Sequence, residues 1–397
     1  MNHPEELSNP DHQQPGCDHE WVDTQSRFSE LCQQWSGQEF LAIDTEFVRT
    51  RTFYPKLGLL QVADAQGRYL IDPLTIEDFQ PLKLILENPD IVKVLHAASE
   101  DTEIFSCFIN ARTQRLFDTQ VGAAYLGFGT SIGYANLVKQ KLQVELPKDE
   151  TRSDWLQRPL SENQKLYAAR DVEYLYDIYL KQKVELEKQQ RIEWVFEDSD
   201  RIVAASLPQD PDSYYLKIRQ AWQMRGQKLW LLKTLAAWRE RLAMAKDLPR
   251  TRVIRDALVF EIAQSMPGSI GRLNRIQGLY PAFARRYGEQ VLAMIEKSRT
   301  VGREDYPARI PGPLKVEAGQ MLKTIRDRTA ELAQQLDLPS ELLARKKWLE
   351  ALVASGMFSG EFHLPEPLTG WRKERVGEPL LETLAQEWQN INTLDEQ

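Results

Sequence analysis

The pattern of apolar residues changes near residue 210 and divides the chain into two regions of different fold class. Before this point, short apolar runs that predict strands alternate with longer stretches of helical periodicity. After it the strand signal disappears, and helical patterns such as residues 228–246 and 252–266 remain. The intervening segment 206–215, SLPQDPDSYY, is rich in Pro, Asp and Ser and is typical of a domain boundary. The sequence therefore predicts an α/β domain followed by helical domains.

The first region has its predicted elements in an order that suits a mixed sheet. Strands are expected at 40–44, 58–64, 68–73 and 91–97, residues 65–67 as a hairpin turn, and helices at 77–88 and 99–109. Residues 1–22 are polar and lack an apolar run, so we expect them to be a disordered tail. The α/β domain is therefore placed at residues 23–208.

The helical region contains an internal repeat. Residues 239–265 align with residues 329–355 at a constant offset of 90, which matches the segment Asp247-Leu248-Pro249 with Asp337-Leu338-Pro339. In each copy we expect one helix to end, the DLP segment to turn and another helix to begin, because Pro is accepted in the first turn of a helix. Two related helical domains are therefore expected, at residues 215–302 and 310–390.

Charge is distributed unevenly along the chain, although the net charge is only −8. Residues 201–300 carry 18 Lys and Arg against 8 Asp and Glu, whereas residues 1–200 carry 20 against 34. A basic block beside an acidic one is expected for a module that binds a polyanion such as nucleic acid. An ordinary solvated surface has the same composition, so charge alone leaves both interpretations open.

Apolar runs and cysteines exclude several classes of protein. No uncharged apolar run approaches the length of about 18 residues that a membrane helix needs. The three cysteines are odd in number and lack CxxC spacing, which argues against a disulfide framework and a zinc site. We therefore expect a protein of the reducing cytoplasm that makes no contact with a membrane. A monomer is expected as well.

Acidic residues stand where two of the predicted strands end. Asp44 and Glu46 are two residues apart on a strand, so their side chains project from the same face, about 7 Å apart, and can converge on one or two cations. Asp101 lies where a strand passes into a helix, at the sheet edge where open α/β folds bind ligands. A solvated strand end is the alternative for the Asp44–Glu46 pair alone.

A predicted helix after residue 160 adds a tyrosine and another carboxylate. Ser161 and Gln164 form a capping box, which starts the helix. Tyr167 and Asp171 are four residues apart on it and therefore share a face. The alternative for Tyr167 is a half-buried helix aromatic.

Two further titratable residues near these motifs have structural interpretations. His96 is expected to be a hydrogen-bonded core histidine rather than a metal ligand, because the predicted site already has enough oxygen ligands. Asp118 precedes the helical stretch TQVGAAYL and is expected to cap it.

The acidic residues and the tyrosine resemble three motifs of the DEDD superfamily of 3′–5′ exonucleases in order and spacing. These motifs are DTEF with Asp44 and Glu46, HAASED with Asp101, and YAARD with Tyr167 and Asp171, which has the form YxxxD. The stretch DTEFVRTRTFYPKLGLLQ resembles the ribonuclease D family, and DLPRTRVIRDALVFEIAQSMP resembles its HRDC domain. The resemblance implies an RNase H-like α/β exonuclease domain followed by two all-α helical domains of HRDC type.

The same resemblance implies hydrolysis of RNA from a free 3′ end, with tRNA precursors among the substrates and nucleoside 5′-monophosphates as products. It also implies two divalent metal ions, Mg²⁺ or Mn²⁺, for which carboxylate oxygens are suitable ligands. In this scheme Asp44 bridges both ions, while Glu46 and Asp171 complete one site. Asp101 helps to hold the other ion through water, and Tyr167 orients the attacking water and takes its proton.

Other residues around the first motif are candidates for RNA contact. Arg49 and Arg51 are expected to grip a phosphate, and Phe53 or Tyr54 to stack on a terminal base. Gln61, on the next strand, is a candidate for contact with the terminal sugar. A rim charge, a packed aromatic ring and an interior hydrogen-bonding amide are the respective alternatives.

Two rival functions fit parts of the sequence. A DNA-proofreading exonuclease has the same acids, but it normally accompanies a polymerase rather than these helical domains. A non-catalytic nucleic-acid-binding protein with this fold is expected to have lost at least one acid, whereas all four are present.

Overall fold

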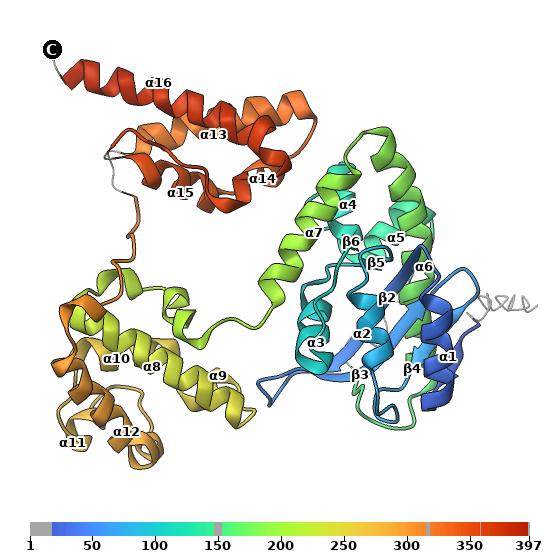
Figure 1. Cartoon of the computed structure of the whole chain (residues 1–397), viewed down its shortest axis with the longest axis horizontal. Coiled ribbons are helices and arrows are strands. Elements are labelled where there is room, and N and C mark those ends of the chain that lie inside the picture. The colour runs from blue at the N-terminus through green and yellow to red at the C-terminus, as the bar shows by residue number, and fades with distance from the viewer. Residues whose placement is uncertain (1–17, 147–152, 315–317, 358, 396–397) are drawn as a thin grey trace, which may run out of the picture. The chain divides into compact units, whose positions relative to one another are not determined.

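The computed structural model describes residues 18–146, 153–314, 318–357 and 359–395 (Figure 1). Its internal contacts divide the chain into two compact units. The first contains the described residues up to Val48, together with Leu57–Asp101 and Ile109–Val203. The second contains Arg49–Lys56, Thr102–Phe108 and the described residues from Ala204 onward. Two short segments from the first half of the chain therefore belong to the helical unit.

A six-stranded sheet in the order β1-β4-β3-β2-β5-β6 forms the centre of the first unit. The strands are β1 Glu20–Val22, β2 Phe40–Val48, β3 Lys56–Ala63, β4 Arg68–Ile71, β5 Val92–Leu95 and β6 Leu116–Asp118. β2 pairs in parallel with β5, and β5 with β6, whereas β3 and β4 form the predicted antiparallel hairpin. The mixed sheet expected from the sequence is confirmed.

The first strand corrects the prediction for the N-terminal segment. Residues 1–17 lie outside the described residues, but Glu20–Val22 form β1, which pairs in parallel with β4. Val22 is buried. The expectation of a disordered tail up to residue 22 is therefore wrong for its last residues. A three-residue strand is too short to show an apolar period, so only its pairing with β4 defines it.

Helices cover both faces of the sheet. They are α1 Gln25–Trp35, α2 Gln80–Leu86, α3 Ser99–Ile109, α4 Thr119–Tyr125, α5 Tyr134–Leu142, α6 Glu162–Lys188 and α7 Ile192–Ser206. Helix α6 packs on one face against β2, β4 and β5, and α1 and α2 lie together on the other (Figure 1). Among the described residues, every helix is too short or too polar to cross a membrane.

Helix α6 begins where the capping box predicts. Ser161 Oγ accepts a hydrogen bond from the Gln164 amide at 3.2 Å, and Gln164 Oε1 accepts one from the Ser161 amide at 2.9 Å. Ala168, Ala169 and Val172 are buried on the side that meets the sheet. Because these side chains are small, the helix lies close to β2, and its polar residues reach the end of that strand.

The first helical domain follows a short linker. It comprises the 3₁₀ turns Pro211–Lys217, Ala221–Gln223 and Arg303–Asp305 and the helices α8 Gly226–Ala245, α9 Arg250–Val253, α10 Asp256–Ser265, α11 Ile270–Leu273 and α12 Pro281–Thr300. The predicted helix 252–266 is interrupted between α9 and α10. The buried Arg239 donates to the Ile254 carbonyl at 3.2 Å and to Asp256 Oδ1 at 2.5 Å. The carbonyl that a continuous helix would use internally is thus bound by a side chain.

The second helical domain repeats this arrangement. It comprises α13 Gly319–Leu336, α14 Ser340–Leu343, α15 Lys346–Gly356, the 3₁₀ turn Glu366–Leu368, the π-helical turn Lys373–Gly377 and α16 Glu378–Asp395. Helices α14 and α15 begin 90 residues after α9 and α10, as the internal repeat predicts. Asp247 and Asp337 follow the first long helix of each copy with left-handed backbone, at φ 46° and 50°.

Candidate active site

Three elements of the first unit bring the motif residues to one pocket of about 280 Å³. Asp44 and Glu46 lie on β2, Asp101 in the first turn of α3, and Tyr167 and Asp171 on α6. All of these side chains line the pocket. The structure thus brings together residues that lie far apart in the sequence, in the arrangement expected from the strand and helix periods.

The carboxylates are close enough to share a cation. Asp44, Glu46 and Asp171 each offer one carboxylate oxygen, and these oxygens lie within 4.8 Å of one another. Asp101 lines the same pocket and adds a fourth acid. A set of oxygen donors suits a hard divalent cation such as Mg²⁺ or Mn²⁺, whereas zinc favours His and Cys. The residues present therefore fit a divalent-metal site.

Burial and mutual repulsion disfavour the charged form of these acids. Removal from water raises the pKa of Glu46 to about 8, with further contributions from the charges of Asp171 and Asp101. Burial raises the pKa of Asp171 to about 7 and that of Asp101 to about 6. The pKa of Asp44 lies well above its usual value, first through burial and then through the neighbouring carboxylates. A bound cation would relieve this cost.

The position of Asp101 is fixed by neighbours on two sides. Thr45 Oγ1 donates to Asp101 Oδ1 at 2.5 Å. The turn that precedes α3 contains Ala97 with left-handed backbone, and Asp118 accepts hydrogen bonds from the amides of Ala97 and Ala98 at 3.0 and 2.9 Å. Asp118 also caps α4, as predicted. The capping residue therefore shapes the turn before Asp101, which no local sequence signal reveals.

His96 and Tyr134 line the pocket but were not predicted as site residues. His96 Nδ1 lies 3.0 Å from Thr119 Oγ1, and the ring also interacts with the backbone of Ile132. The ring is hydrogen-bonded, as expected, but it lies in the wall of the pocket. The Tyr134 hydroxyl donates to the backbone carbonyls of Arg170, at 3.2 Å, and Asp171. It anchors α6 beside the acids through a long-range contact that no sequence period marks.

Tyr167 keeps its proton in this environment. Burial, followed by the charges of Asp171, Glu46 and Asp44, raises the pKa of the phenol. A hydrogen bond between Tyr167 and Asp171 stabilises the Asp171 carboxylate. The Tyr167 ring also lies 6.2 Å from the ring of Trp155, which restricts its movement. The phenol is thus held as a hydrogen-bond donor that faces the acids.

Gln61 was a candidate either for contact with a terminal sugar or for an interior hydrogen bond, and its surroundings match neither. Its side chain on β3 is completely buried and does not line the pocket, so the predicted contact with a terminal sugar is wrong. Its amide nitrogen and oxygen have no hydrogen-bond partner among the described residues. The alternative of an interior hydrogen-bonding amide is therefore not met either.

The arginines and aromatic residues after β2 differ in their surroundings. Arg49 donates to both carboxylate oxygens of Glu103, at 2.7 and 2.9 Å, and to the Phe53 carbonyl at 3.0 Å. Phe53 packs against the core of the first helical domain, and the Tyr54 ring lies 4.9 Å from it. Arg49 and Phe53 are thus engaged within the protein, which favours the alternatives of a charge pair and a packed aromatic. Arg51 is exposed.

Family models match both parts of the chain. Residues 19–187 match a 3′–5′ exonuclease domain, and residues 228–295 match the HRDC domain. The first match includes β1 and the whole pocket, and the second covers most of the first helical domain.

Relatives match nearly the whole length. The chain is 41% identical over 366 residues to the ribonuclease D of Pseudomonas paraeruginosa. The matched region covers 92% of this chain and 97% of that protein. It is 36% identical over 376 residues to the ribonuclease D of Escherichia coli, spanning 93% and 99%. The crystal structure of Escherichia coli RNase D, an exoribonuclease involved in structured RNA processing, superposes with a TM-score of 0.87 and covers 94% of this chain and 99% of that one. The chain belongs to the ribonuclease D family of 3′–5′ exoribonucleases.

Proposed function

We propose that this exoribonuclease hydrolyses RNA from a free 3′ end with two divalent cations, Mg²⁺ or Mn²⁺, and releases nucleoside 5′-monophosphates. The observation that carries the proposal is the convergence of four acids in one pocket, where burial and repulsion disfavour their charged forms. Such a cluster is costly unless a cation occupies it.

The side chains divide the work of the reaction among them. When bound, the two cations would neutralise charge on the scissile phosphate and help to activate the attacking water. Asp44 interacts with the charges of all three other acids and would hold both cations, while Glu46 and Asp171 would complete one of the two sites. Asp101 supports the second, held by Thr45. Tyr167 would orient the attacking water through its hydroxyl, which faces the acids.

The test compares matched RNA and DNA oligonucleotides with free 3′ ends, each with Mg²⁺, with Mn²⁺ and with chelator. We expect shortening of RNA from the 3′ end, metal dependence and nucleoside monophosphates as products. Preferential cleavage of DNA would support the proofreading alternative. Binding without cleavage under every metal condition would support a non-catalytic nucleic-acid-binding protein.

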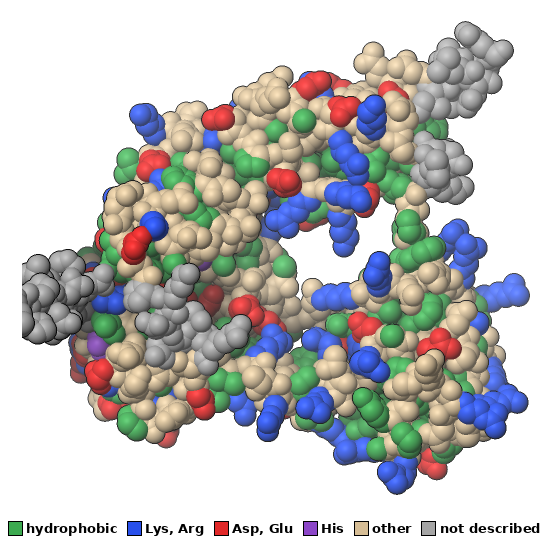
Figure 2. All heavy atoms as spheres, turned by 180° about the vertical axis from the view of Figure 1, so that it is seen from behind, with side chains coloured by type: hydrophobic (Ala, Val, Ile, Leu, Met, Phe, Trp, Pro, Cys, Tyr) green, Lys and Arg blue, Asp and Glu red, His purple; other side chains and the backbone are tan. Residues whose placement is uncertain are grey.

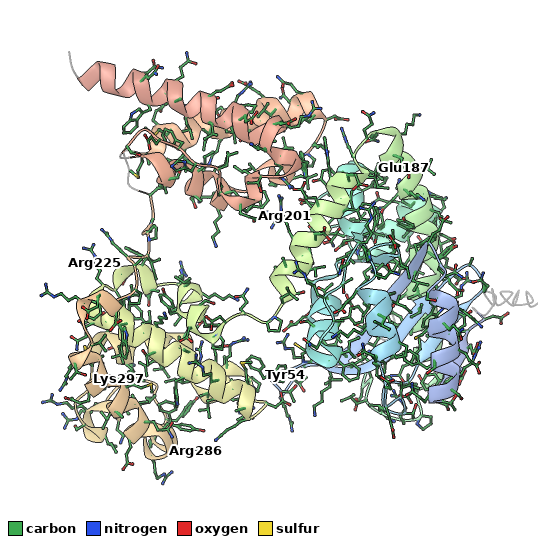
Figure 3. All side chains as sticks on the ribbon, in the orientation of Figure 1. Tyr54, Glu187, Arg201, Arg225, Arg286 and Lys297 are labelled. Atoms are coloured by element: carbon green, nitrogen blue, oxygen red, sulfur yellow. The ribbon has the colours of Figure 1, made fainter. Side chains whose placement is uncertain are left out.

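The first helical domain supports structured RNA, including tRNA precursors, as the substrate class. Lys and Arg side chains gather over its surface in Figure 2, and Arg225, Arg286 and Lys297 are labelled in Figure 3. Its exposed basic residues include Arg252, Arg255, Arg272, Arg275, Arg285, Arg286 and Lys297. Arg272 and Arg275 line a groove of about 640 Å³. A basic surface of this kind attracts those phosphates of a folded RNA that lie far from the scissile bond.

The proposal also includes a monomer that acts in the reducing cytoplasm. Cys32 and Cys107, the two cysteines among the described residues, are both free. Free thiols are typical of that compartment. Sedimentation of the purified protein tests the monomer, and fractionation of cells that express it tests the location.

A further inference from the structure

The first helical domain holds the loop that follows the catalytic strand. Residues 49–56 come directly after β2 and belong to the helical unit. Asp247 Oδ1 accepts hydrogen bonds from the amides of both Phe53 and Tyr54, at 2.9 and 3.0 Å. Hydrogen bonds from amides to a carboxylate are stronger than those between neutral groups, so one side chain fixes two consecutive residues of the loop.

An arginine of the same helical domain closes over the loop. The Arg250 guanidinium carbon lies 4.6 Å from the centroid of the Phe53 ring, which packs against the helical core. Arg250 Nε donates to Glu240 Oε2 at 2.6 Å, and Glu240 is buried. Because Glu240 holds the guanidinium in place, the Phe53 ring packs against both a fixed cation and the helical core.

Asp247 itself is fixed by the end of α8. Its left-handed backbone is one that Asp tolerates, and its amide donates to the Met244 carbonyl at 3.2 Å. The equivalent Asp337 of the second repeat has the same backbone conformation and a similar amide bond, to Gln334 at 3.3 Å. No hydrogen bond to the Asp337 carboxylate is found in the part of the chain that the structure describes. The two repeats therefore provide a matched pair of helix ends. The Asp247 carboxylate binds the loop 49–56, whereas the Asp337 carboxylate binds no loop among the described residues.

The held loop connects to the segments that carry two of the acids. Arg49 donates to the Phe53 carbonyl and to both oxygens of Glu103. Arg49 lies three residues after Glu46, and Glu103 lies two residues after Asp101. A continuous set of hydrogen bonds and ion pairs thus runs from Asp247 to residues beside both acids.

We propose that Asp247 is a positioning residue for the metal-binding acids. By holding residues 49–56, it keeps Glu46 and Asp101 at the separation that hydrolysis requires. The inference rests on the proposed function. The positioning role is a second role for the first helical domain, in addition to RNA binding. It affects the catalytic site even when the substrate is too short to reach the basic surface.

Three single variants of the full-length protein test this role. Asp247→Gly removes the acceptor and retains a residue that accepts left-handed backbone. Asp247→Asn keeps an acceptor oxygen and also tolerates this conformation. Asp337→Gly makes the same change at the helix end that holds no loop. The measurements are hydrogen exchange of residues 49–56, Mn²⁺ affinity, and kcat and KM on a short single-stranded RNA.

For Asp247→Gly we expect faster exchange of the Phe53 and Tyr54 amides, weaker Mn²⁺ binding and a kcat about tenfold lower, because small misplacements of catalytic groups are costly. The KM should be unchanged, since Asp247 does not touch the RNA. Asp337→Gly should resemble the wild type in all measurements, and Asp247→Asn, which keeps the acceptor but loses the charge, should lie between the wild type and Asp247→Gly.

Unchanged exchange or unchanged kcat in Asp247→Gly would overturn the positioning role. An equal loss in Asp337→Gly would overturn it as well, since the effect would then come from helix stability. If the wild type hydrolysed no RNA with any divalent metal, the proposed function would fail independently. Mn²⁺ affinity would then test the positioning role by itself. Weaker binding in Asp247→Gly alone would support this role, and equal binding in all variants would overturn it.

Discussion

Asp44 faces the charges of three other carboxylates, so removing its own charge affects stability and catalysis in opposite directions. Asp44→Asn keeps the shape of the side chain and removes the repulsion, and we expect a higher melting temperature in the metal-free protein. The same variant loses a shared metal ligand, and the rate should fall at least ~100-fold. Thermal unfolding with chelator and turnover with Mg²⁺ measure the two effects. Near-normal turnover by the folded variant would exclude the two-metal assignment.

Tyr167 differs from the acids because it contributes a hydroxyl and no ligand charge. Tyr167→Phe deletes only this hydroxyl, so we expect Mn²⁺ affinity to change little while the rate falls by about 10² to 10⁴. Mn²⁺ titration and single-turnover cleavage of a short RNA separate the two properties. A large loss of metal affinity would show instead that Tyr167 is a ligand or a structural residue.

The acids on β2, α3 and α6 lower the stability of the folded protein when they are charged. The size of this effect depends on pH. The raised pKa values mean that the folded protein binds more protons than the unfolded chain between about pH 4, where ordinary carboxyls titrate, and about pH 8, the value for Glu46. The cluster therefore lowers stability progressively as pH rises through this window. Saturating Mg²⁺ should remove most of this loss.

The control for pH is a variant that lacks one acid, because other groups also titrate. Burial lowers the pKa of Lys93 to about 7, which makes stability rise with pH from about pH 7 upward and opposes the effect of the acids at the top of their window. We therefore expect the melting temperature of metal-free wild type, relative to Asp171→Asn, to fall between about pH 5 and pH 8. A difference that stays constant across this range would contradict the raised pKa of Asp171.

Elements defined by local pattern were predicted, and those defined by distant contacts were not. β2, the β3–β4 hairpin, α3 and the capping box of α6 follow from apolar period and cap residues within each segment. β1 depends on pairing with β4, and the break between α9 and α10 depends on Arg239. The site shows the same division, because motif spacing marks Asp44 or Tyr167, whereas only tertiary contact marks Tyr134 or Asp247.

The charge distribution predicts how the whole molecule responds to salt. Arg272→Gln combined with Arg275→Gln removes two exposed charges of the basic groove. We expect the slope of log affinity against log salt for a tRNA-like RNA to flatten by about 1.4 to 1.8, with little change in kcat on a short single strand. Arg326→Gln with Lys347→Gln, two exposed charges of the second helical domain, is the matched control. Equal slopes for both double variants would remove the groove from the RNA-binding surface.

The membership of residues 49–56 and 102–108 in the helical unit has an evolutionary consequence. A recombination breakpoint in the linker near residue 210 separates two regions of sequence, but it leaves Phe53 behind while removing the hydrophobic residues that surround it. Such a graft would expose an aromatic side chain on one product and an incomplete core on the other. An exchange of the first helical domain between genes would therefore preserve this core only if residues 49–56 were exchanged with it.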